Sequence, residues 1–377
     1  MQIHIVDVAE EPTGASATAR RLRRDGFVAG LSALGHGVTL TEVDLDLVAA
    51  GAPLADLGAF DVVHALSVAV LPVVPRSGAL VVSPRVSVSR VGGQSVVHVE
   101  RGAAQALART PARIRTIEVP SVEAGSAWGP AISSLPIVTV PMGVDTERYT
   151  PRGTSAAAKE DRVRVLAFGL PGTSHGFHEL VRILPHTPSV DVVFAGAPGV
   201  DLAGSQTARE TYSLACALGV DDRVSFARTF DEDAAPHVLR SSDVVVAVTG
   251  NDINHYLVLQ AMACGKPVVS ANMGAFLDIV VDDVTGLLVP HGNESALRTA
   301  LRRLTEDAFF REGLGLAGRD RAVSRFDWSR VTAEAVRVYE RSRVAAMPMG
   351  PSSGGDSVRT EAEPVEVLRE SARQLLG

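Results

Sequence analysis

The most constraining part of the sequence is residues 243–290, where apolar runs alternate with turn residues. Residues 243–249 carry no charge after the first position, which is typical of a parallel strand buried on both faces. A helical pattern at 255–264 ends before Gly-Lys-Pro, and a second apolar strand pattern follows at 267–271. This alternation predicts a doubly wound α/β sheet. Ligands of such sheets bind beyond the carboxyl ends of the strands, where the loop 250–255 is expected.

Four motifs follow one another between residues 140 and 340. They are VPMGVDTERYTP at 140–151, AMACGKPVVS at 261–270, VTGLLVP at 284–290 and FDWSRVTAEAVRVYE at 326–340. Together they resemble the family 4 retaining glycosyltransferases, which have the GT-B fold. The resemblance is close over residues 130–345 and loose before them. It implies an α/β fold of two Rossmann-like, doubly wound domains that face each other across a cleft.

The alternation of strand and helix patterns, with this resemblance, predicts the domain organisation. We expect an N-terminal Rossmann-like acceptor domain at residues 1–150 and a C-terminal Rossmann-like nucleotide-sugar domain at 151–327. The resemblance implies a cross-over helix at 328–346 that returns to the first domain. Residues 347–377 read as a Pro/Gly/Ser-rich linker and an amphipathic helix. Two interpretations of that helix stay open: it docks on the first domain, or on another copy of the chain in a homodimer.

Two positions of the donor site differ from the family pattern, which has a Glu at each. Here they are Asp252 and Gln260. The resemblance implies that Asp252 contacts the transferred sugar, a catalytic position, and that Gln260 holds the nucleotide ribose. Gln260 still accepts a hydroxyl proton but is neutral. Between the two positions, Asn254 and His255 replace the family's Phe-Gly.

The family's phosphate-binding side chains are also replaced. Leu170 stands at the position of an Arg and His175 at that of a Lys. A Leu cannot neutralise a phosphate, and a His is mostly uncharged near pH 7. Backbone N–H groups at helix starts can still bind a diphosphate. The predicted donor-binding residues are Leu170, Gly172, His175, Gly176, Gly196, Asn254, His255, Tyr256 and Gln260.

The first domain is rich in arginines where the family has a Gly-rich loop. This run predicts either a solvated helix face or an anion clamp at the mouth of the cleft. Arg85 takes the place of a His that the family often has near the reacting sugar, so we predict a catalytic role. His98 is either a pocket residue or a core residue, on a strand, 95–99, that we expect within a mostly parallel sheet. The predicted acceptor-binding residues are Arg20, Arg21, Arg23, Arg24, Arg90, His98 and Arg101.

Composition excludes several classes of function. The chain has 377 residues and a net charge of −7, which argues against a general nucleic-acid binder. Cys216 and Cys264 lie in apolar helical contexts and are expected to be buried free thiols. No metal-ligand cluster or P-loop occurs in the sequence, so we predict no metal and no cofactor. The chain opens as a strand, and its apolar runs are short, so we expect a cytoplasmic protein without stable membrane association.

The resemblance and the residues together predict a retaining, metal-independent glycosyltransferase. It would move a sugar from a nucleotide-activated donor to a small polar acceptor in specialised metabolism. The departures at the donor site leave two alternatives. One is a catalytically silent relative that binds a ligand or a partner enzyme. The other is a GT-B enzyme that forms C–N or C–S bonds.

Overall fold

The described part of the chain is most of residues 1–344. The computed structural model describes residues 1–9, 15–49, 54, 59–75, 78–91, 94–99, 103–109, 113–128, 135–156, 162–169, 176–228, 230–248, 250–252 and 255–344. The predicted linker and terminal helix at 347–377 lie outside these residues. So do five predicted site residues: Arg101, Leu170, Gly172, His175 and Asn254.

The first sheet has six parallel strands in the order β2-β1-β3-β4-β7-β8. Its central strands are buried on both faces, as their Val- and Ile-rich sequences predict. The strands are β1 (Gln2–Val8), β2 (Gly37–Val43), β3 (Val62–Ala65), β4 (Ala79–Val82), β7 (Ile114–Val119) and β8 (Ile137–Thr139). Between them lie α1 (Ala15–Ala33), α2 (Leu45–Ala49), the 3-10 turn η1 (Val68–Val70), α3 (Ala103–Arg109) and α4 (Val122–Trp128).

The second sheet also has six parallel strands, in the order β11-β10-β9-β12-β13-β14. This is the Rossmann order, in which the direction of winding reverses beside the first strand. The strands are β9 (Val163–Phe168), β10 (Val190–Ala195), β11 (Val224–Phe226), β12 (Val244–Ala247), β13 (Val268–Ala271) and β14 (Leu287–Val289). The connecting elements are α5 (Phe177–Ile183), η2 (Leu184–His186), α6 (Gln206–Ala217), η3 (Asp221–Arg223), α7 (Ala235–Arg240), α8 (His255–Ala263) and α9 (Ala275–Ile279). The prediction of two doubly wound α/β sheets is confirmed.

One predicted strand belongs elsewhere. Residues 95–99 fall in β6 (Gln94–Val99), which pairs antiparallel with β5 (Val86–Val91) in a hairpin outside the first sheet. The physical reason is visible in the sequence, because Ser and Val alternate along β5 and Gly-Gly at 92–93 separates the two strands. Such alternation suits a hairpin with a solvated face, not a parallel strand buried on both faces.

The thiol prediction is half right. Cys264 is buried, but Cys216 is exposed. On α6 the buried face is formed by Thr207, Ala208, Thr211 and Ala215, and Cys216 lies on the opposite side.

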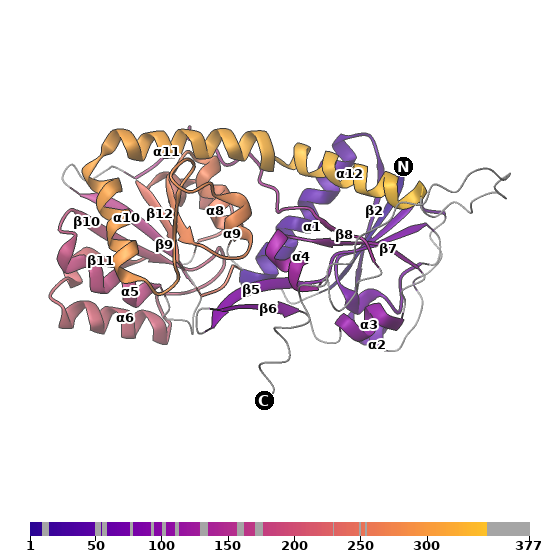
Figure 1. Cartoon of the computed structure of the whole chain (residues 1–377), viewed down its shortest axis with the longest axis horizontal. Helices are drawn as coiled ribbons and strands as arrows, with labels where there is room; N and C mark the ends of the chain where they lie inside the picture. Colours follow the sequence, from indigo (N-terminus) through magenta and orange to yellow (C-terminus); the bar gives the residue numbers. More distant parts are fainter. Residues whose placement is uncertain are drawn as a thin grey trace, which may run out of the picture. The chain divides into compact units, whose positions relative to one another are not determined.

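Three helices complete the described chain after β14: α10 (Glu294–Glu306), α11 (Ala308–Arg321) and, beyond the π-helical turn η4 (Ala322–Phe326), α12 (Trp328–Val344). Helix α12 packs against α1 and β4 of the first sheet (Figure 1). Its first residue, Trp328, lies against Gly26 and Gly143, where a Cβ atom on either glycine would overlap the indole ring. The absence of both side chains is therefore what lets this ring pack between α1 and the segment after β8.

We expect Gly26→Ala to lower the free energy of unfolding by about 1–3 kcal/mol, because the added methyl group overpacks the Trp328 contact. Urea denaturation measures the change. The matched control is Gly313→Ala on α11, where a Cβ atom meets nothing within 4 Å. That variant should be neutral or more stable by up to about 1 kcal/mol. Equal effects of the two variants would contradict the packing argument.

Candidate functional site

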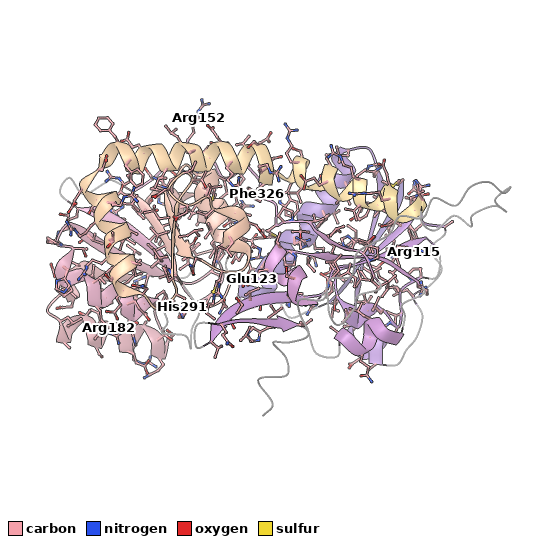
Figure 2. The ribbon with its side chains drawn as sticks, viewed as in Figure 1. Arg115, Glu123, Arg152, Arg182, His291 and Phe326 are labelled. Atoms are coloured by element: carbon pink, nitrogen blue, oxygen red, sulfur yellow. The ribbon has the colours of Figure 1, made fainter. Side chains whose placement is uncertain are left out.

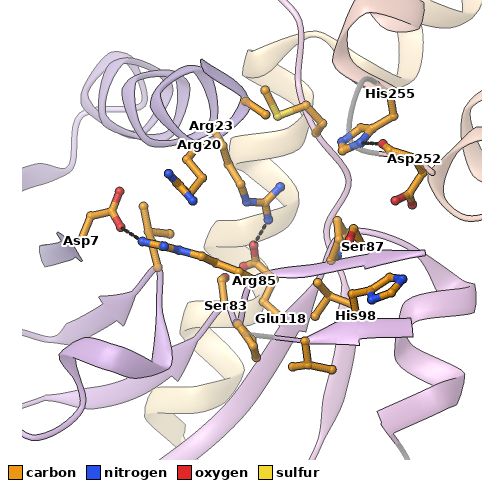
Figure 3. A pocket seen from close by; sticks show the side chains of 17 residues that line it. Asp7, Arg20, Arg23, Ser83, Arg85, Ser87, His98, Glu118, Asp252 and His255 are labelled. Atoms are coloured by element: carbon orange, nitrogen blue, oxygen red, sulfur yellow. Dashed lines mark hydrogen bonds and ion pairs between the residues drawn. The ribbon is translucent and has the colours of Figure 1, made fainter. Parts of the chain in front are cut away.

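A cavity of about 350 Å³ lies at the carboxyl ends of the first sheet's strands, facing the start of α8 (Figure 3). Its polar lining contains charges of both signs. The second sheet contributes Asp252 and His255, and the hairpin β5–β6 contributes Ser87 and His98. The remaining polar residues of the lining are Asp7, Arg20, Arg23, Ser83, Arg85 and Glu118.

Arg23 and Glu118 form an ion pair at the floor of this cavity (Figure 3). The Glu118 side chain is fully buried, and Arg23 also donates to the carbonyl oxygens of Val140 and Pro141, each at 3.2 Å. A buried pair of this kind requires hydrogen bonds to offset its desolvation. Arg23 therefore has a structural task in addition to facing the cavity.

Asp7 and Arg85 form a second, looser pair, with Arg85 Nη2 at 3.8 Å from Asp7 Oδ1. Asp7 is buried and accepts the N–H of Val8 at 2.8 Å. Burial raises the pKa of Asp7, while the Val8 N–H and the Arg85 guanidinium act in the opposite direction. The pair places one anionic and one cationic group side by side at the end of β1.

The predicted arginine run divides between two tasks. Arg20 and Arg23 line the cavity, whereas Arg21 pairs with Glu232 and Arg24 pairs with Asp25 and Glu42. Arg20 and Arg23 are three residues apart and share a face of α1, and Arg24, one turn after Arg20, is instead held by its two carboxylate partners. The anion-clamp interpretation stays a prediction, and it now concerns Arg20 and Arg23.

The two other described acceptor candidates lie on the hairpin. Arg90 is outside the cavity and donates to the carbonyl oxygen of Asn272 at 3.1 Å. His98 lines the cavity, is exposed, and shares a hydrogen bond with the Ser89 hydroxyl at 2.6 Å. The core interpretation of His98 is therefore wrong, because the hairpin lies outside the sheet.

Asp252 links the hairpin to the second sheet. Its Oδ1 accepts the N–H of Val88 at 2.8 Å, and its Oδ2 accepts the N–H of Ala275, the first residue of α9, at 2.9 Å. Its own N–H donates to the Val88 carbonyl oxygen at 3.0 Å. The side chain is 4% exposed, so these partners satisfy a carboxylate that is almost out of water.

A second carboxylate makes a similar link. Glu123 of α4, labelled in Figure 2, accepts the N–H of Gly274, and Asp278 of α9 accepts the N–H of Val122 at 2.9 Å. Two backbone N–H groups at the start of α9, on Gly274 and Ala275, are thus already bound to carboxylates of the chain itself. An incoming anion would have to compete with these carboxylates for both groups.

His255 begins α8, and its Nδ1 lies 2.7 Å from the carbonyl oxygen of Asp252. A carbonyl only accepts, so Nδ1 carries the proton and Nε2 is left as an acceptor. Burial lowers the pKa of His255, against the smaller opposing influence of Asp252. The ring is neutral near pH 7 and brings no positive charge to the cavity.

The remaining described donor candidates lie away from this cavity. Gln260 is 3% exposed, and in the described part of the chain its Oε1 has no hydrogen-bond partner, nor has the hydroxyl of buried Tyr256. Gly176 has a φ of 87° and its N–H donates to Glu179 at 2.7 Å. Gly196 follows β10, where a Cβ atom would lie 2.6 Å from the carbonyl oxygen of Val200. Among the described residues predicted for the donor side, His255 and the catalytic candidate Asp252 reach the cavity, whereas Gly176, Gly196, Tyr256 and Gln260 do not line it.

Sequence reasoning missed four polar groups of this site: Ser87 on the hairpin, and Asp7, Ser83 and Glu118. Asp7 and Glu118 stand near the carboxyl ends of apolar strands, and Ser83 follows such a strand directly. That position is the signal that could have found them, because polar residues there face the ligand side of an open α/β sheet.

Asp252→Ala should lower the free energy of unfolding by about 2–5 kcal/mol, because it leaves two buried N–H groups without an acceptor. Urea denaturation again provides the measurement. The control is Asp233→Ala, since the Asp233 side chain is 93% exposed and pairs with Arg148 at the surface. Its loss should stay below about 1 kcal/mol. A loss at Asp252 no larger than at Asp233 would contradict the linking role.

Two properties of the described residues complete the site's setting. No helix among them combines the length and the apolar character needed to cross a bilayer. In the same part of the chain, no three His, Cys, Asp or Glu side chains are grouped as metal ligands.

Comparison with known proteins adds sequence relatives. Residues 165–307 match the family described as glycosyl transferases group 1. The D-inositol 3-phosphate glycosyltransferase of Salinispora arenicola is 30% identical over 237 residues, which are 56% of this chain and 51% of that protein. The phosphatidyl-myo-inositol mannosyltransferase of Mycobacterium leprae is 36% identical over 123 residues, 32% of this chain and 33% of that protein. The chain spans about half the length, or less, of these curated relatives.

Solved structures extend the similarity over nearly the whole chain. Sucrose-phosphate synthase from Thermosynechococcus elongatus superposes with a TM-score of 0.70 at 18% identity, covering 92% of this chain and 100% of the other. Anabaena HepE in complex with UDP gives 0.65 at 18% identity, covering 90% and 100%. At such identities these matches establish the fold. The chain has the GT-B fold of glycosyltransferases, and its residues 165–307 carry the group 1 glycosyl transferase pattern.

Proposed function

We propose that the protein is a glycosyltransferase that moves a sugar from a nucleotide-activated donor to a small polar acceptor, with retention and without a metal. The observation that carries this proposal is the group 1 match over residues 165–307, a segment that includes β12, α8 and α9. The GT-B fold supports it, because two doubly wound sheets present their ligand-binding edges to a shared cavity.

On the donor side, Gln260 is the residue we place at the nucleotide ribose. Its buried Oε1 lacks a partner in the described chain, and a buried acceptor without a donor is costly. A ribose hydroxyl would supply that donor. The turn at Gly196, at the carboxyl end of β10, is our place for the base. HepE was solved with UDP and with UDP-glucose, which supports a nucleoside diphosphate sugar as the class of donor.

On the acceptor side, the cavity suits a polyol that carries an anionic group. Arg20 and Arg85 bring cationic groups to its lining, while Asp7 brings an anion. Guanidinium groups bind phosphate or carboxylate through paired hydrogen bonds. The name of the Salinispora relative specifies an inositol phosphate acceptor for that protein, which supports the same chemical class here.

The proposed reaction needs no protein side chain as general base. The acceptor hydroxyl attacks the anomeric carbon on the face from which the diphosphate leaves, and a donor phosphate oxygen takes the hydroxyl proton. The bond to the diphosphate breaks as the glycosidic bond forms. Arg85 or Arg20 would stabilise the negative charge of the leaving group. Asp252, which retains a second lone pair on each oxygen, would accept a hydrogen bond from a hydroxyl of the sugar.

A silent relative is the second candidate, and one observation favours it. The N–H groups of Gly176, Gly274 and Ala275, on the edge where a donor diphosphate would bind, already contact carboxylates. A protein with no exchangeable donor site would show this arrangement permanently. A glycosyltransferase would exchange at least one of these carboxylates for the donor phosphate.

Calorimetry with UDP, GDP and ADP separates the two candidates. We expect one of the three to bind, and Gln260→Ala to weaken it by about 1–3 kcal/mol, because a ribose hydrogen bond is lost. Gln206→Ala is the control: this glutamine is exposed on α6, where it bonds Glu210, and its loss should leave the affinity unchanged. Wild-type protein that binds none of the three would favour the silent relative.

The cavity arginines are tested by steady-state kinetics with the nucleotide sugar identified in that way. If Arg85 or Arg20 stabilises the leaving group, its change to Ala should lower kcat at least tenfold, about 1.4 kcal/mol. If it holds the acceptor, the KM of the acceptor should rise instead. Arg24→Ala is the matched control on α1, because Arg24 is outside the cavity lining and pairs with Asp25 and Glu42. Wild-type kinetics in both cavity variants would refute the anion clamp.

A further inference from the structure

A chain of hydrogen bonds leads from helix α12 into the cavity. His64 of β3 is fully buried, with its Nδ1 2.7 Å from the Tyr339 hydroxyl and its Nε2 2.7 Å from the Ser83 hydroxyl. Ser83 follows β4 and lines the cavity (Figure 3). The two ring nitrogens of His64 therefore connect a tyrosine of the last helix to a serine at the ligand side of the first sheet.

The His64 ring is neutral. Burial lowers its pKa to about 4, against the opposing charge of Glu118 on β7, while Arg23 on α1 acts in the same direction as burial. Tyr339 on α12 is also uncharged, since burial raises the pKa of its phenol well above the usual value. A neutral imidazole has one donor nitrogen and one acceptor nitrogen, so the chain of hydrogen bonds has a direction.

Two observations set that direction. The phenol hydroxyl of Tyr339 is buried, and within the described chain it hydrogen-bonds to His64. The hydroxyl proton of Tyr339 therefore needs His64 Nδ1 as its acceptor. Glu118 Oε2 lies 3.8 Å from Nε2 and has no hydrogen-bond partner among the described residues. Its negative charge favours a proton on the facing nitrogen. Both place the His64 proton on Nε2.

We propose that Tyr339 and His64 fix Ser83 as a hydrogen-bond donor to an oxygen of the acceptor substrate. With Nε2–H donating to Ser83 Oγ, the hydroxyl proton of Ser83 is directed to the cavity. A group that accepts hydrogen bonds is then favoured beside Ser83: a hydroxyl, ether, carboxylate or phosphate oxygen. An ammonium group, which only donates, is disfavoured. This assignment rests on the proposed function, and it makes Tyr339 and His64 positioning residues for substrate selection.

The direction of the chain is measured by ¹⁵N–¹H NMR of the His64 ring in the full-length protein. We expect the Nε2–H form from pH 8 to pH 6, and a measurable fraction of the Nδ1–H form in Tyr339→Phe, where the donor to Nδ1 is lost and Glu118 is the remaining influence that favours Nε2–H. The matched control is Ser342→Ala. Ser342 lies on the same helix and bonds Thr116 of β7 at 2.7 Å, so the variant loses a buried hydrogen bond of α12 without touching His64. An Nδ1–H form in the wild type, or no change in Tyr339→Phe, overturns the proposal.

The ligand side is measured by calorimetry with D-inositol 3-phosphate and with inorganic phosphate. Ser83→Ala should weaken binding of the first probe about tenfold, Ser83→Thr should largely restore it, and Ser342→Ala should leave it unchanged. Equal affinities for wild type and Ser83→Ala, or a wild type that binds neither probe, overturn the assignment of Ser83. Nucleoside diphosphate affinity should be the same in all four proteins. If no nucleoside diphosphate binds, the proposed glycosyltransferase is refuted. The NMR measurement on His64 still tests the direction of the hydrogen bonds independently.

Discussion

The cavity depends on one carboxylate. Asp252 binds the hairpin at Val88: its carboxylate accepts the Val88 N–H, and its own N–H donates to the Val88 carbonyl oxygen. The carboxylate also accepts the N–H of Ala275 at the start of α9. The hairpin supplies Ser87 and His98 to the cavity, and the Arg90 N–H, which donates to the Gly250 carbonyl oxygen at 3.2 Å, holds it against the same loop. A neutral side chain of the same size would leave at least one of the two N–H groups without an acceptor.

Several charged groups of the site are, like Asp252, already bound by other groups of the chain. Arg23 and Glu118 are committed to each other in the floor of the cavity, and Asp252 is committed to backbone N–H groups. His255 is neutral because its burial lowers its pKa. In the described lining, the other guanidinium groups come from the first sheet and α1: Arg85, which pairs loosely with Asp7, and Arg20.

The sequence predicted the sheets well and the site unevenly. Apolar runs such as 244–247 are buried on both faces, so their composition alone indicates parallel strands. The arginine run was ambiguous, because helical periodicity tells which residues share a face but not which face meets the cavity. His64 could not be recognised, since a single polar residue inside an apolar strand looks the same whether it pairs with a neighbouring element or faces a ligand. Its partner Tyr339 is distant in sequence.

The position of Tyr339 connects the cavity to the path of the chain between the sheets. Helix α12 starts at Trp328, which packs on Gly26 and Gly143, and one residue earlier Asp327 accepts a hydrogen bond from Thr146 at 2.6 Å. On the preceding helix, Arg319 donates to the carbonyl oxygens of Thr146, Tyr149 and Ala263. The segment that carries Tyr339 to His64 is therefore held at one end by Arg319 of α11, which contacts α8, and at the other by Trp328, which packs against α1. A shift of this segment that moved the Tyr339 hydroxyl away from Nδ1 would also remove one of the two influences on the His64 proton, so the proposed hydrogen-bond direction of Ser83 depends on the position of α12.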